Sequence, residues 1–334
     1  MKAYLYILLI VATTMVLCAV AASVIVDPYR IVHPLIGEFS FEPNSRVPKV
    51  TYLISSCSLY DGYFVGDSRS MTLSGSDLGD VQGRRYYNFS TLADDIESIV
   101  RRVNFLIGKG CPISAVIVGE SIDVLMDESE KNAYILLLGE NPAVSGENRI
   151  AFYSRYFLSA QALTTYARAV HRSPTAHDIY YPDGHADYLF GMEDGTAFAL
   201  PRCGARKLAD ADRKMLFARL AGYRQIASMS VRDNFKVIVW IAPLNARESR
   251  LFDDPVVKDY LQQLRAIPNL PVVEADRNSP LLSDYHSWHD CGHFRRTVFD
   301  QLVAPAVSRL LGHSTARVMP VDYGKYAHAD ESAR

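Results

Sequence analysis

The sequence predicts an α/β domain with a mostly parallel sheet covered by helices on both faces, preceded by one membrane-crossing helix. Three observations support this fold class. After about residue 50, apolar segments of strand length alternate with segments of helical periodicity. The strand segments are apolar throughout, which is typical of parallel strands buried on both faces. Near the N-terminus, residues 4–26 carry no charged side chain.

The uncharged N-terminal stretch reads YLYILLIVATTMVLCAVAASVIV. As a helix with a rise of ~1.5 Å per residue it spans roughly 35 Å, enough to cross a bilayer. A secretory signal has a shorter apolar region of about 7–15 residues, so we expect residues 1–26 to be an uncleaved inner-membrane anchor. The small residues at 19–21 keep a cleaved signal as the alternative. Either segment sends the rest of the chain to the periplasmic side of the membrane.

Composition limits the classes of partner and the redox state. The net charge is −2, from 35 basic and 37 acidic residues. The chain therefore lacks the surplus of basic residues that would indicate a nucleic-acid partner. Four cysteines follow the apolar stretch: Cys57, Cys111, Cys203 and Cys291. Outside the cytoplasm an even number permits two disulfides in any of three pairings. Free buried thiols are the alternative.

Residues 27–50 are rich in Pro and Gly and are expected to be a linker, residues 51–315 the α/β domain, and residues 316–334 a polar tail. Strands are expected at 60–68, 113–121, 235–243 and 270–275. Helices are expected at 94–110, 153–172, 211–230, 255–267 and 295–311, the last interrupted at Pro305. The segments 122–150 and 173–208 are long for connections, so we expect them to shape the site.

Polar residues end three of the expected strands, at 66–68, 119–121 and 243–245. In parallel sheets, ligands bind outside the carboxyl ends of the strands. Ser68, in the sequence GDSRS, therefore stands where a nucleophile would lie, although an ordinary turn is the simpler interpretation.

A base and its carboxylate partner are both available near the C-terminal end of the domain. Asp290 and His293 stand three residues apart, just before the last expected helix. A nucleophilic serine needs a base within hydrogen-bond reach, and the base needs a carboxylate to fix its tautomer. Alternatively, Asp290 caps the final helix and His293 lies on the surface.

The two ends of this pattern resemble the SGNH/GDSL hydrolase superfamily. Its first block, Gly-Asp-Ser, follows the first strand, as at Ser68. Its last block, Asp-x-x-His, precedes the last helix, as at Asp290 and His293. The resemblance implies a three-layer α/β/α, flavodoxin-like domain in which Ser68, His293 and Asp290 form a catalytic triad.

The two middle blocks match more loosely. In YYNFSTLADD, Asn88 and Asp94 fit the second block, while Ala93 stands at its glycine position. In VGESID, Gly119 fits the third block, while Ser121 stands at its asparagine position. In the superfamily these blocks supply the oxyanion hole. The resemblance therefore implies that the backbone N–H groups of Ser68 and Ala93 form the oxyanion hole, with Asn88 or Ser121 as a side-chain donor.

The chain as a whole also resembles a group of bacterial extracytoplasmic proteins of exopolysaccharide assembly, which includes alginate O-acetylation proteins. The features that it shares with them are the membrane anchor, the segment VDPYRIVHP and the SGNH-like domain with divergent middle blocks. The resemblance implies a serine O-acyltransferase or esterase acting on a cell-surface polysaccharide. It also implies a membrane protein partner that supplies the acyl donor, and no cofactor or metal. We expect Arg69 and Trp288 to contact the substrate.

Two other classes of function stay open. His286, His289 and His293 are numerous enough for an open zinc site, but their spacing would align them only on a helix. The departures in the middle blocks motivate a catalytically inactive scaffold, or a glycan-binding component of an assembly complex.

Overall fold

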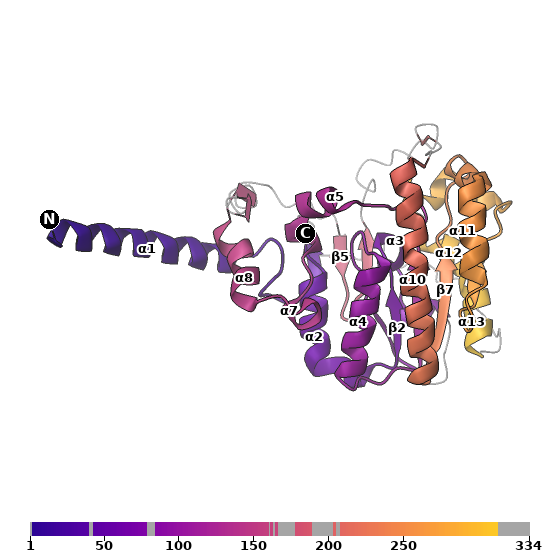
Figure 1. Cartoon of the computed structure of the whole chain (residues 1–334), viewed down its shortest axis with the longest axis horizontal. Helices are drawn as coiled ribbons and strands as arrows, with labels where there is room; N and C mark the ends of the chain where they lie inside the picture. Colours follow the sequence, from indigo (N-terminus) through magenta and orange to yellow (C-terminus); the bar gives the residue numbers. More distant parts are fainter. Residues whose placement is uncertain are drawn as a thin grey trace, which may run out of the picture.

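The computed structural model of the chain describes residues 2–39, 43–78, 84–159, 161–162, 164–165, 178–188, 203–204 and 208–312. A long helix, α1 (Lys2–Val26), extends from a mixed α/β body (Figure 1). The polar tail expected at 316–334 lies outside the described residues. So does much of the helix expected at 153–172, of which α8 (Arg149–Leu158) forms the first part.

The body is built on a five-stranded sheet of β2 (Gly62–Val65), β3 (Tyr86–Asn88), β4 (Ala115–Glu120), β7 (Lys236–Ile241) and β8 (Val272–Glu274). All neighbouring pairs are parallel and the order is β3-β2-β4-β7-β8, which confirms the predicted mostly parallel sheet. From β2 the chain adds β3 on one side and β4 on the other. The carboxyl ends of β2 and β4 therefore flank the switch point at which open α/β sheets bind ligands.

Alternate side chains of the strands enter two separate hydrophobic clusters, one on each face of the sheet. Tyr63 and Val65 pack with α4 (Ile96–Gly108), α10 (Asp210–Arg232) and α11 (Pro255–Arg265). Phe64 and Trp240 pack on the other face with α12 (Arg296–Leu302) and α13 (Ala304–Leu311). Figure 1 shows α4, α10 and α11 side by side over the strands. Helices thus cover both faces, which explains why the strands are apolar throughout.

The last predicted helix is interrupted, as expected from its proline. α12 ends at Leu302 and α13 begins at Ala304, so that Pro305 lies in the first turn of α13. A proline there loses no hydrogen bond, because the first N–H groups of a helix have no intrahelical partner. Pro255 opens α11 in the same way, and the Asp254 carboxylate caps it by accepting from Val256 N at 2.8 Å.

A second, antiparallel sheet was not predicted. It contains β1 (Gly37–Phe39), β5 (Asp178–Tyr180) and β6 (Ala186–Tyr188), each only three residues long. The expected linker 27–50 contains β1 and the start of α2 (Arg46–Ser56). The other described helices are α3 (Ser68–Met71), α5 (Glu128–Ala133), α6 (Ile135–Leu138), α7 (Pro142–Ser145), η1 (Cys57–Leu59), η2 (Gly75–Leu78), η4 (Glu248–Asp253), η5 (Pro280–Leu282) and η6 (Tyr285–Ser287).

Two disulfides link the four cysteines that follow α1. Cys57 pairs with Cys111, which joins the end of α2 to the segment before β4. Cys203 pairs with Cys291, two residues before His293. The second bridge therefore restrains the segment that carries the candidate base. Cys18, in α1, is the remaining cysteine and is exposed.

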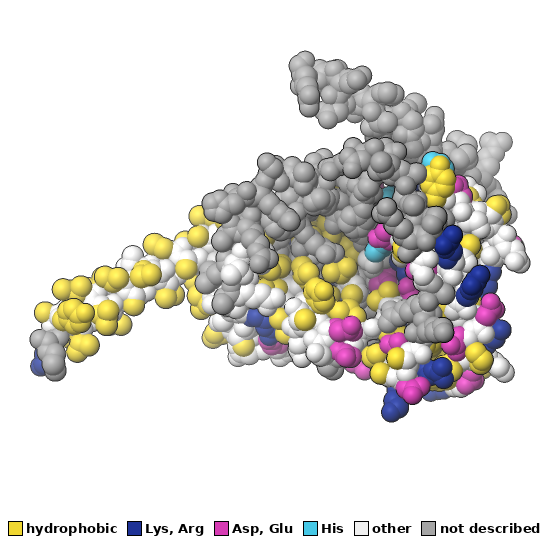
Figure 2. Space-filling model, turned by 90° about the horizontal axis from the view of Figure 1, so that it is seen from above, with side chains coloured by type: hydrophobic (Ala, Val, Ile, Leu, Met, Phe, Trp, Pro, Cys, Tyr) yellow, Lys and Arg dark blue, Asp and Glu magenta, His cyan; other side chains and the backbone are white. Residues whose placement is uncertain are grey.

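α1 is long and apolar enough to cross a membrane. Its large apolar side chains are exposed, from Tyr4 to Leu17 and again at Ile25. Figure 2 shows hydrophobic side chains along the whole projecting helix. Because α1 packs on the body only near its C-terminal end, its apolar surface is available to lipid.

Candidate active site

Ser68, His293 and Asp290 lie together at the carboxyl edge of the sheet. Ser68 Oγ is 2.8 Å from His293 Nε2. His293 Nδ1 is 2.8 Å from Asp290 Oδ2 and 3.0 Å from Asp290 Oδ1. Ser68 and His293 are separated by 225 positions in the sequence, and the fold places them within hydrogen-bond distance. The arrangement has the order of contacts that a serine nucleophile, its base and the orienting carboxylate require.

A tight turn after β2 presents Ser68. Gly66 has φ +154°, and a Cβ there would collide with Ser70 Oγ. Glycine is therefore required at this position by conformation and by space. Asp67 then caps α3, its carboxylate accepting from Arg69 N at 3.0 Å. Ser68 is consequently the first residue of α3, half-buried, with its hydroxyl directed at the base.

Asp290 fixes the tautomer of His293. Burial alone would raise the pKa of Asp290. The hydrogen bonds from the His293 ring and from the N–H groups of His293 and Gly292, both 2.7 Å, nevertheless hold that pKa at about 2. An ionised carboxylate can only accept, so Nδ1 of His293 carries the proton. Nε2 is then left with a lone pair that faces the Ser68 hydroxyl, as a general base needs.

Ala93 has a backbone conformation that glycine favours. Its φ is +42°, in the left-handed region, at the position where the second superfamily block has glycine. The loop that contains it lies beside the serine turn, because Thr91 N donates to the Gly66 carbonyl at 2.9 Å. Arg46 donates to the carbonyls of Leu92 and Ala93, at 2.9 and 3.3 Å.

Replacing Ala93 by glycine is expected to stabilise the fold. An alanine in the left-handed region destabilises the folded state by roughly 1–2 kcal/mol. Glycine removes this strain, but it also gives the unfolded chain more conformational entropy, which offsets about half of the gain. We expect Ala93→Gly to raise the free energy of unfolding by about 0–1 kcal/mol in a denaturant titration. Ala218→Gly, on the exposed face of α10, is the matched control and should lower it by about 0.5–1 kcal/mol. Equal destabilisation by both changes would contradict the assignment of strain to Ala93.

The Asn88 amide is occupied, which corrects its expected role at the oxyanion. Its Nδ2 donates to the carbonyls of Ser70, Met71 and Leu73 at 2.7, 3.1 and 2.7 Å, and the residue is buried. It therefore fastens the chain after the serine turn to β3. Ser121, directly after β4, has a buried Oγ without a hydrogen-bond partner among the described residues. Of the two side-chain donors expected, the Asn88 amide is thus occupied, whereas the Ser121 hydroxyl has no partner in the part of the chain that the structure describes.

Arg69 and Trp288 contact protein and not an open surface, so their expected roles in substrate binding are also corrected. Arg69 is 4% exposed; its guanidinium donates twice to Asp123, at 2.5 and 2.6 Å, and its Nε to the Gly292 carbonyl. Burial lowers the pKa of Arg69, but Asp123 raises it more, so the group stays charged. Arg69 thus joins the serine turn to the histidine loop. Trp288 is 1% exposed and packs edge-on against Phe294.

Other residues at the same edge of the sheet had no predicted role. Asn245 is fully buried and its amide donates to the Cys291 carbonyl at 2.8 Å. The sequence placed Asn245 at a strand end, which was the available signal. Glu248 interacts electrostatically with Asp123 and Asp290, and burial together with these carboxylates raises its pKa to about 7. Its segment is rich in charges, so no pattern distinguished Glu248 from its neighbours.

The raised pKa of Glu248 predicts a pH-dependent stability. Since the folded state holds this proton more tightly than the unfolded state, stability falls as pH rises between about 4.5 and 7. Glu248→Gln removes the titration. We therefore expect the melting temperature of the variant, relative to the native chain, to be higher at about pH 8 than at about pH 5. The same difference at both pH values would show that the carboxyl of Glu248 does not titrate in this range.

The three histidines of the segment do not meet at one point. His293 Nε2 faces Ser68, while the His286 ring contacts Tyr285. Across the ranges that the structure describes, no group of three His, Cys, Asp or Glu side chains is arranged to hold a metal ion.

A groove lies beside Ala93. Two cavities of about 360 and 320 Å³ share Ala93, Asp95, Glu97 and Lys131 among their lining residues. Lys131 Nζ is 2.8 Å from Asp95, so this ion pair stands where the two cavities meet. The first cavity is lined mainly by apolar side chains, Val124, Leu125, Met126 and Met215 among them. The second is mostly polar. Neither cavity has Ser68, His293 or Asp290 among its lining residues.

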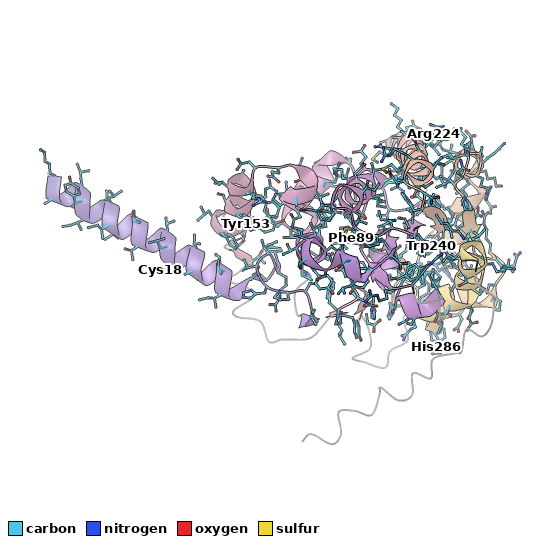
Figure 3. The ribbon with its side chains drawn as sticks, turned by 90° about the horizontal axis from the view of Figure 1, so that it is seen from below. Cys18, Phe89, Tyr153, Arg224, Trp240 and His286 are labelled. Carbon is cyan, nitrogen blue, oxygen red and sulfur yellow. A yellow bond between two sulfur atoms is a disulfide. The ribbon has the colours of Figure 1, made fainter. Side chains whose placement is uncertain are left out.

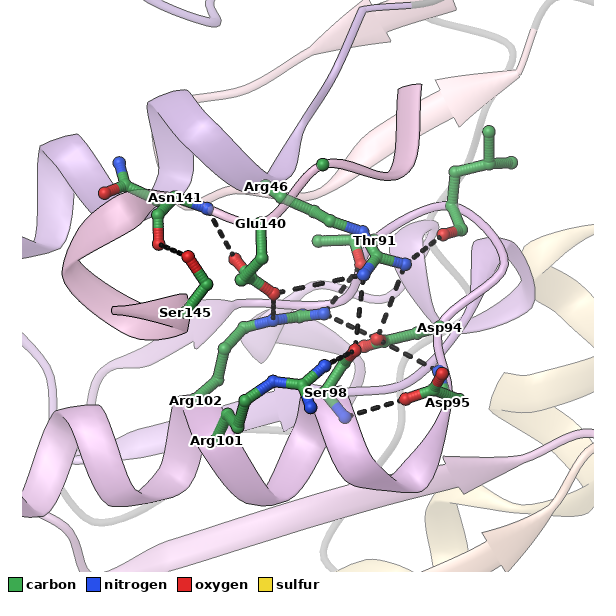
Figure 4. Close-up of polar contacts among 12 residues, drawn as sticks. Arg46, Thr91, Asp94, Asp95, Ser98, Arg101, Arg102, Glu140, Asn141 and Ser145 are labelled. Atoms are coloured by element: carbon green, nitrogen blue, oxygen red, sulfur yellow. Dashed lines mark hydrogen bonds and ion pairs between the residues drawn. The ribbon is translucent and has the colours of Figure 1, made fainter. Parts of the chain in front are cut away.

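A buried ionic network supports the loop that contains Ala93 (Figure 4). Arg102 is fully buried and donates to Glu140 at 3.1 Å, to Asp94 at 2.5 Å and to the Phe89 carbonyl at 2.8 Å. Arg46 lies within 4 Å of the same two carboxylates, at 3.7 Å from Asp94 and 3.9 Å from Glu140. Burial raises the pKa of Asp94 to about 6, although both arginines lower it. Two cations and two carboxylates thus hold both ends of the loop.

Comparison with known proteins gives no family: neither the protein-family models nor the curated proteins include a match to this chain.

Proposed function

We propose that this chain is a serine acyl-ester enzyme of the SGNH type, an O-acyltransferase or esterase that acts on a bacterial cell-surface polysaccharide. The observation that carries the proposal is the continuous hydrogen-bond chain from Ser68 through His293 to Asp290. The sheet order and the helices on both faces agree with the three-layer, flavodoxin-like fold of that superfamily. The triad also lies beside the switch point of the sheet, between β2 and β4.

In the proposed reaction, Ser68 Oγ attacks the carbonyl carbon of an acyl ester. His293 Nε2 takes the serine proton, and Asp290 stabilises the imidazolium that forms. The proton then passes to the leaving alcohol as the C–O bond breaks, which leaves an acyl group on Ser68. A glycan hydroxyl or water, deprotonated by the same histidine, attacks this acyl-enzyme and releases Ser68.

The negative charge on the carbonyl oxygen requires donors close to Ser68. In this proposal they are the backbone N–H groups of Ser68 and Ala93 and the Ser121 hydroxyl. Losing one such donor typically lowers the rate by ~10²–10³-fold. The network of Arg46 and Arg102 would then matter for catalysis, because it holds the backbone on either side of Ala93.

The proposed location is the periplasmic side of the inner membrane, with α1 as a single-pass anchor. The length and exposed apolar surface of α1 support the anchor. The two disulfides support the oxidising side of the membrane. The partners proposed are a polysaccharide acceptor and a membrane protein that supplies the acyl donor.

One observation favours a second candidate, a non-catalytic scaffold or glycan-binding component. Because the Asn88 amide is occupied, the shorter Ser121 hydroxyl is the one expected side-chain donor left for the oxyanion. A weakened oxyanion hole is compatible with a protein that binds a glycan without turning over its ester.

Turnover of an activated acetyl ester by the purified full chain distinguishes these candidates. If the chain is an enzyme, the native protein releases acetate and the Ser68→Ala variant does not. If it is a scaffold, neither the native protein nor the variant releases acetate. Adding a glycan acceptor then separates the two directions. Acetyl groups recovered on the glycan indicate a transferase, whereas acetate alone indicates an esterase.

A further inference from the structure

We propose that α8 is a second membrane contact, lying in the interface of the same bilayer that α1 crosses. This inference rests on the proposed membrane anchor and adds to it a fixed orientation of the catalytic domain. It is carried by the exposed face of α8, by the way α8 packs on α1, and by the length of the apolar part of α1.

α8 has apolar side chains on two opposite faces. Phe152 and Tyr156 are fully buried in a hydrophobic cluster of the body. Ile150 is 78% exposed and Tyr153 39% exposed. Ile150 and Tyr153, three residues apart, therefore form an outward apolar stripe at helical spacing. Tyr153 also stacks on Phe157 with ring centroids 6.1 Å apart, and Phe157 is partly buried against the cluster of the body. The body covers the inner face, whereas Ile150 and Tyr153 are exposed and belong to no hydrophobic cluster of the residues that the structure describes.

The same helix receives the end of α1. Val26, the last residue of α1, packs against the cluster that contains Phe152 and Tyr156. Ser23 is buried, and the Tyr29 ring meets that of Tyr156 edge-on. Figure 1 shows α8 at the junction of α1 with the body, and Figure 3 labels Tyr153 beside that junction.

The turn after α1 is held by its own hydrogen bonds. The buried Asp27 carboxylate accepts from the backbone N–H groups of Ile31, Val32 and His33, at 2.8 to 2.9 Å. The His33 ring lies 3.0 Å from the same carboxylate. The connection between α1 and the body is therefore a specific turn, so the direction of α1 determines which surface of the body faces the bilayer.

The length of α1 places α8 at the level of the lipid headgroups. With Tyr4 at one interface, a hydrocarbon core of ~30 Å takes up about 20 helical residues and ends near Val24. Ser23 and Val26, which contact the body, then lie at the opposite interface. Interfacial helices bury their apolar face about 5–10 Å into the headgroup boundary, and tyrosine is enriched at that depth. The stripe of Ile150 and Tyr153 matches this environment, and the exposed Arg149 beside it suits lipid phosphates.

The proposal is tested by site-specific fluorescence in lipid vesicles that contain the full chain. Cys18 is the one cysteine outside the two disulfides, so a polarity-sensitive dye can label it in the native chain. On a Cys18→Ser background, Ile150→Cys places the dye on the α8 stripe. Val231→Cys, on α10, is the matched control because Val231 is 63% exposed and α10 lies far from α1 (Figure 1).

Lipids that carry a nitroxide near the headgroup should quench most of the emission at position 150 and little at position 231. Deep nitroxides should quench the dye at Cys18. Quenching at Cys18 but not at position 150 would overturn the α8 contact while leaving the anchor in place. No quenching at Cys18 would overturn both. Protection of position 150 from aqueous iodide without lipid quenching would show that a protein, such as a second copy, covers the stripe, and would also overturn the proposal.

Discussion

Ser68→Ala is expected to lower ester turnover by about 10⁴-fold or more without changing the melting temperature. The substitution removes the atom that attacks the acyl carbonyl, and Ser68 is half-buried, so no core packing is lost. His293→Ala should lower turnover to a similar extent, because a hydroxyl without its base is a weak nucleophile. The double variant should be no slower than either single variant, since both residues act in one step.

Ser70→Ala is the matched control within the same turn. Ser70 is buried and its Oγ has no hydrogen-bond partner among the described residues, so the hydroxyl supports neither the fold nor the proposed reaction. Turnover by this variant should stay close to that of the native chain. Full turnover by Ser68→Ala, or an equal loss in Ser70→Ala, would contradict the assignment of Ser68 as the nucleophile.

Arg102→Met is expected to lower the free energy of unfolding by about 3–5 kcal/mol. The guanidinium is fully buried between Asp94 and Glu140, and it also donates to the Phe89 carbonyl. Its removal leaves two buried carboxylates with less compensation and an unsatisfied carbonyl. Denaturant titration followed by tryptophan fluorescence is suitable, because both tryptophans, Trp240 and Trp288, are buried.

Arg101→Met is the control, since Arg101 is the preceding residue of α4 but is exposed. Its guanidinium contacts the Ser98 hydroxyl (Figure 4), and exposed contacts of this kind contribute roughly 0–1 kcal/mol. Equal effects of the two substitutions would show that the buried network does not stabilise the loop. If Arg102→Met also lowers turnover under conditions where it is folded, the network positions Ala93 as proposed.

Local patterns in the sequence sufficed to predict the parallel sheet and to select Ser68, His293 and Asp290 as the candidate triad. β2, β4, β7 and β8 are apolar runs. Gly-Asp-Ser places Ser68 directly after β2, and Asp-x-x-His places Asp290 and His293 just before α12. β3 was recognised only as a motif, because its three residues are too short for a period to be visible. The small antiparallel sheet has strands equally short, and pairing between distant segments leaves no local signal.

The roles of the polar side chains could not be predicted, because they depend on partners far apart in the sequence. Arg69 next to Ser68 looked available to a substrate, but Asp123 and Gly292 occupy it. Asn88 fits the motif, yet three carbonyls of the serine turn take up its amide. Conversely, alanine at position 93 looked like a departure from the motif, whereas its φ of +42° preserves the backbone shape that glycine would give.

Covalent trapping of the nucleophile tests the central claim most directly. The full chain is treated with a fluorophosphonate, which reacts with serines that an adjacent base activates. Intact-mass analysis and peptide mapping then locate the adduct. The account predicts one adduct, on Ser68, that is absent from Ser68→Ala and strongly reduced in His293→Ala. An unlabelled but folded chain, or an adduct that persists in Ser68→Ala, would contradict a catalytic triad of Ser68, His293 and Asp290.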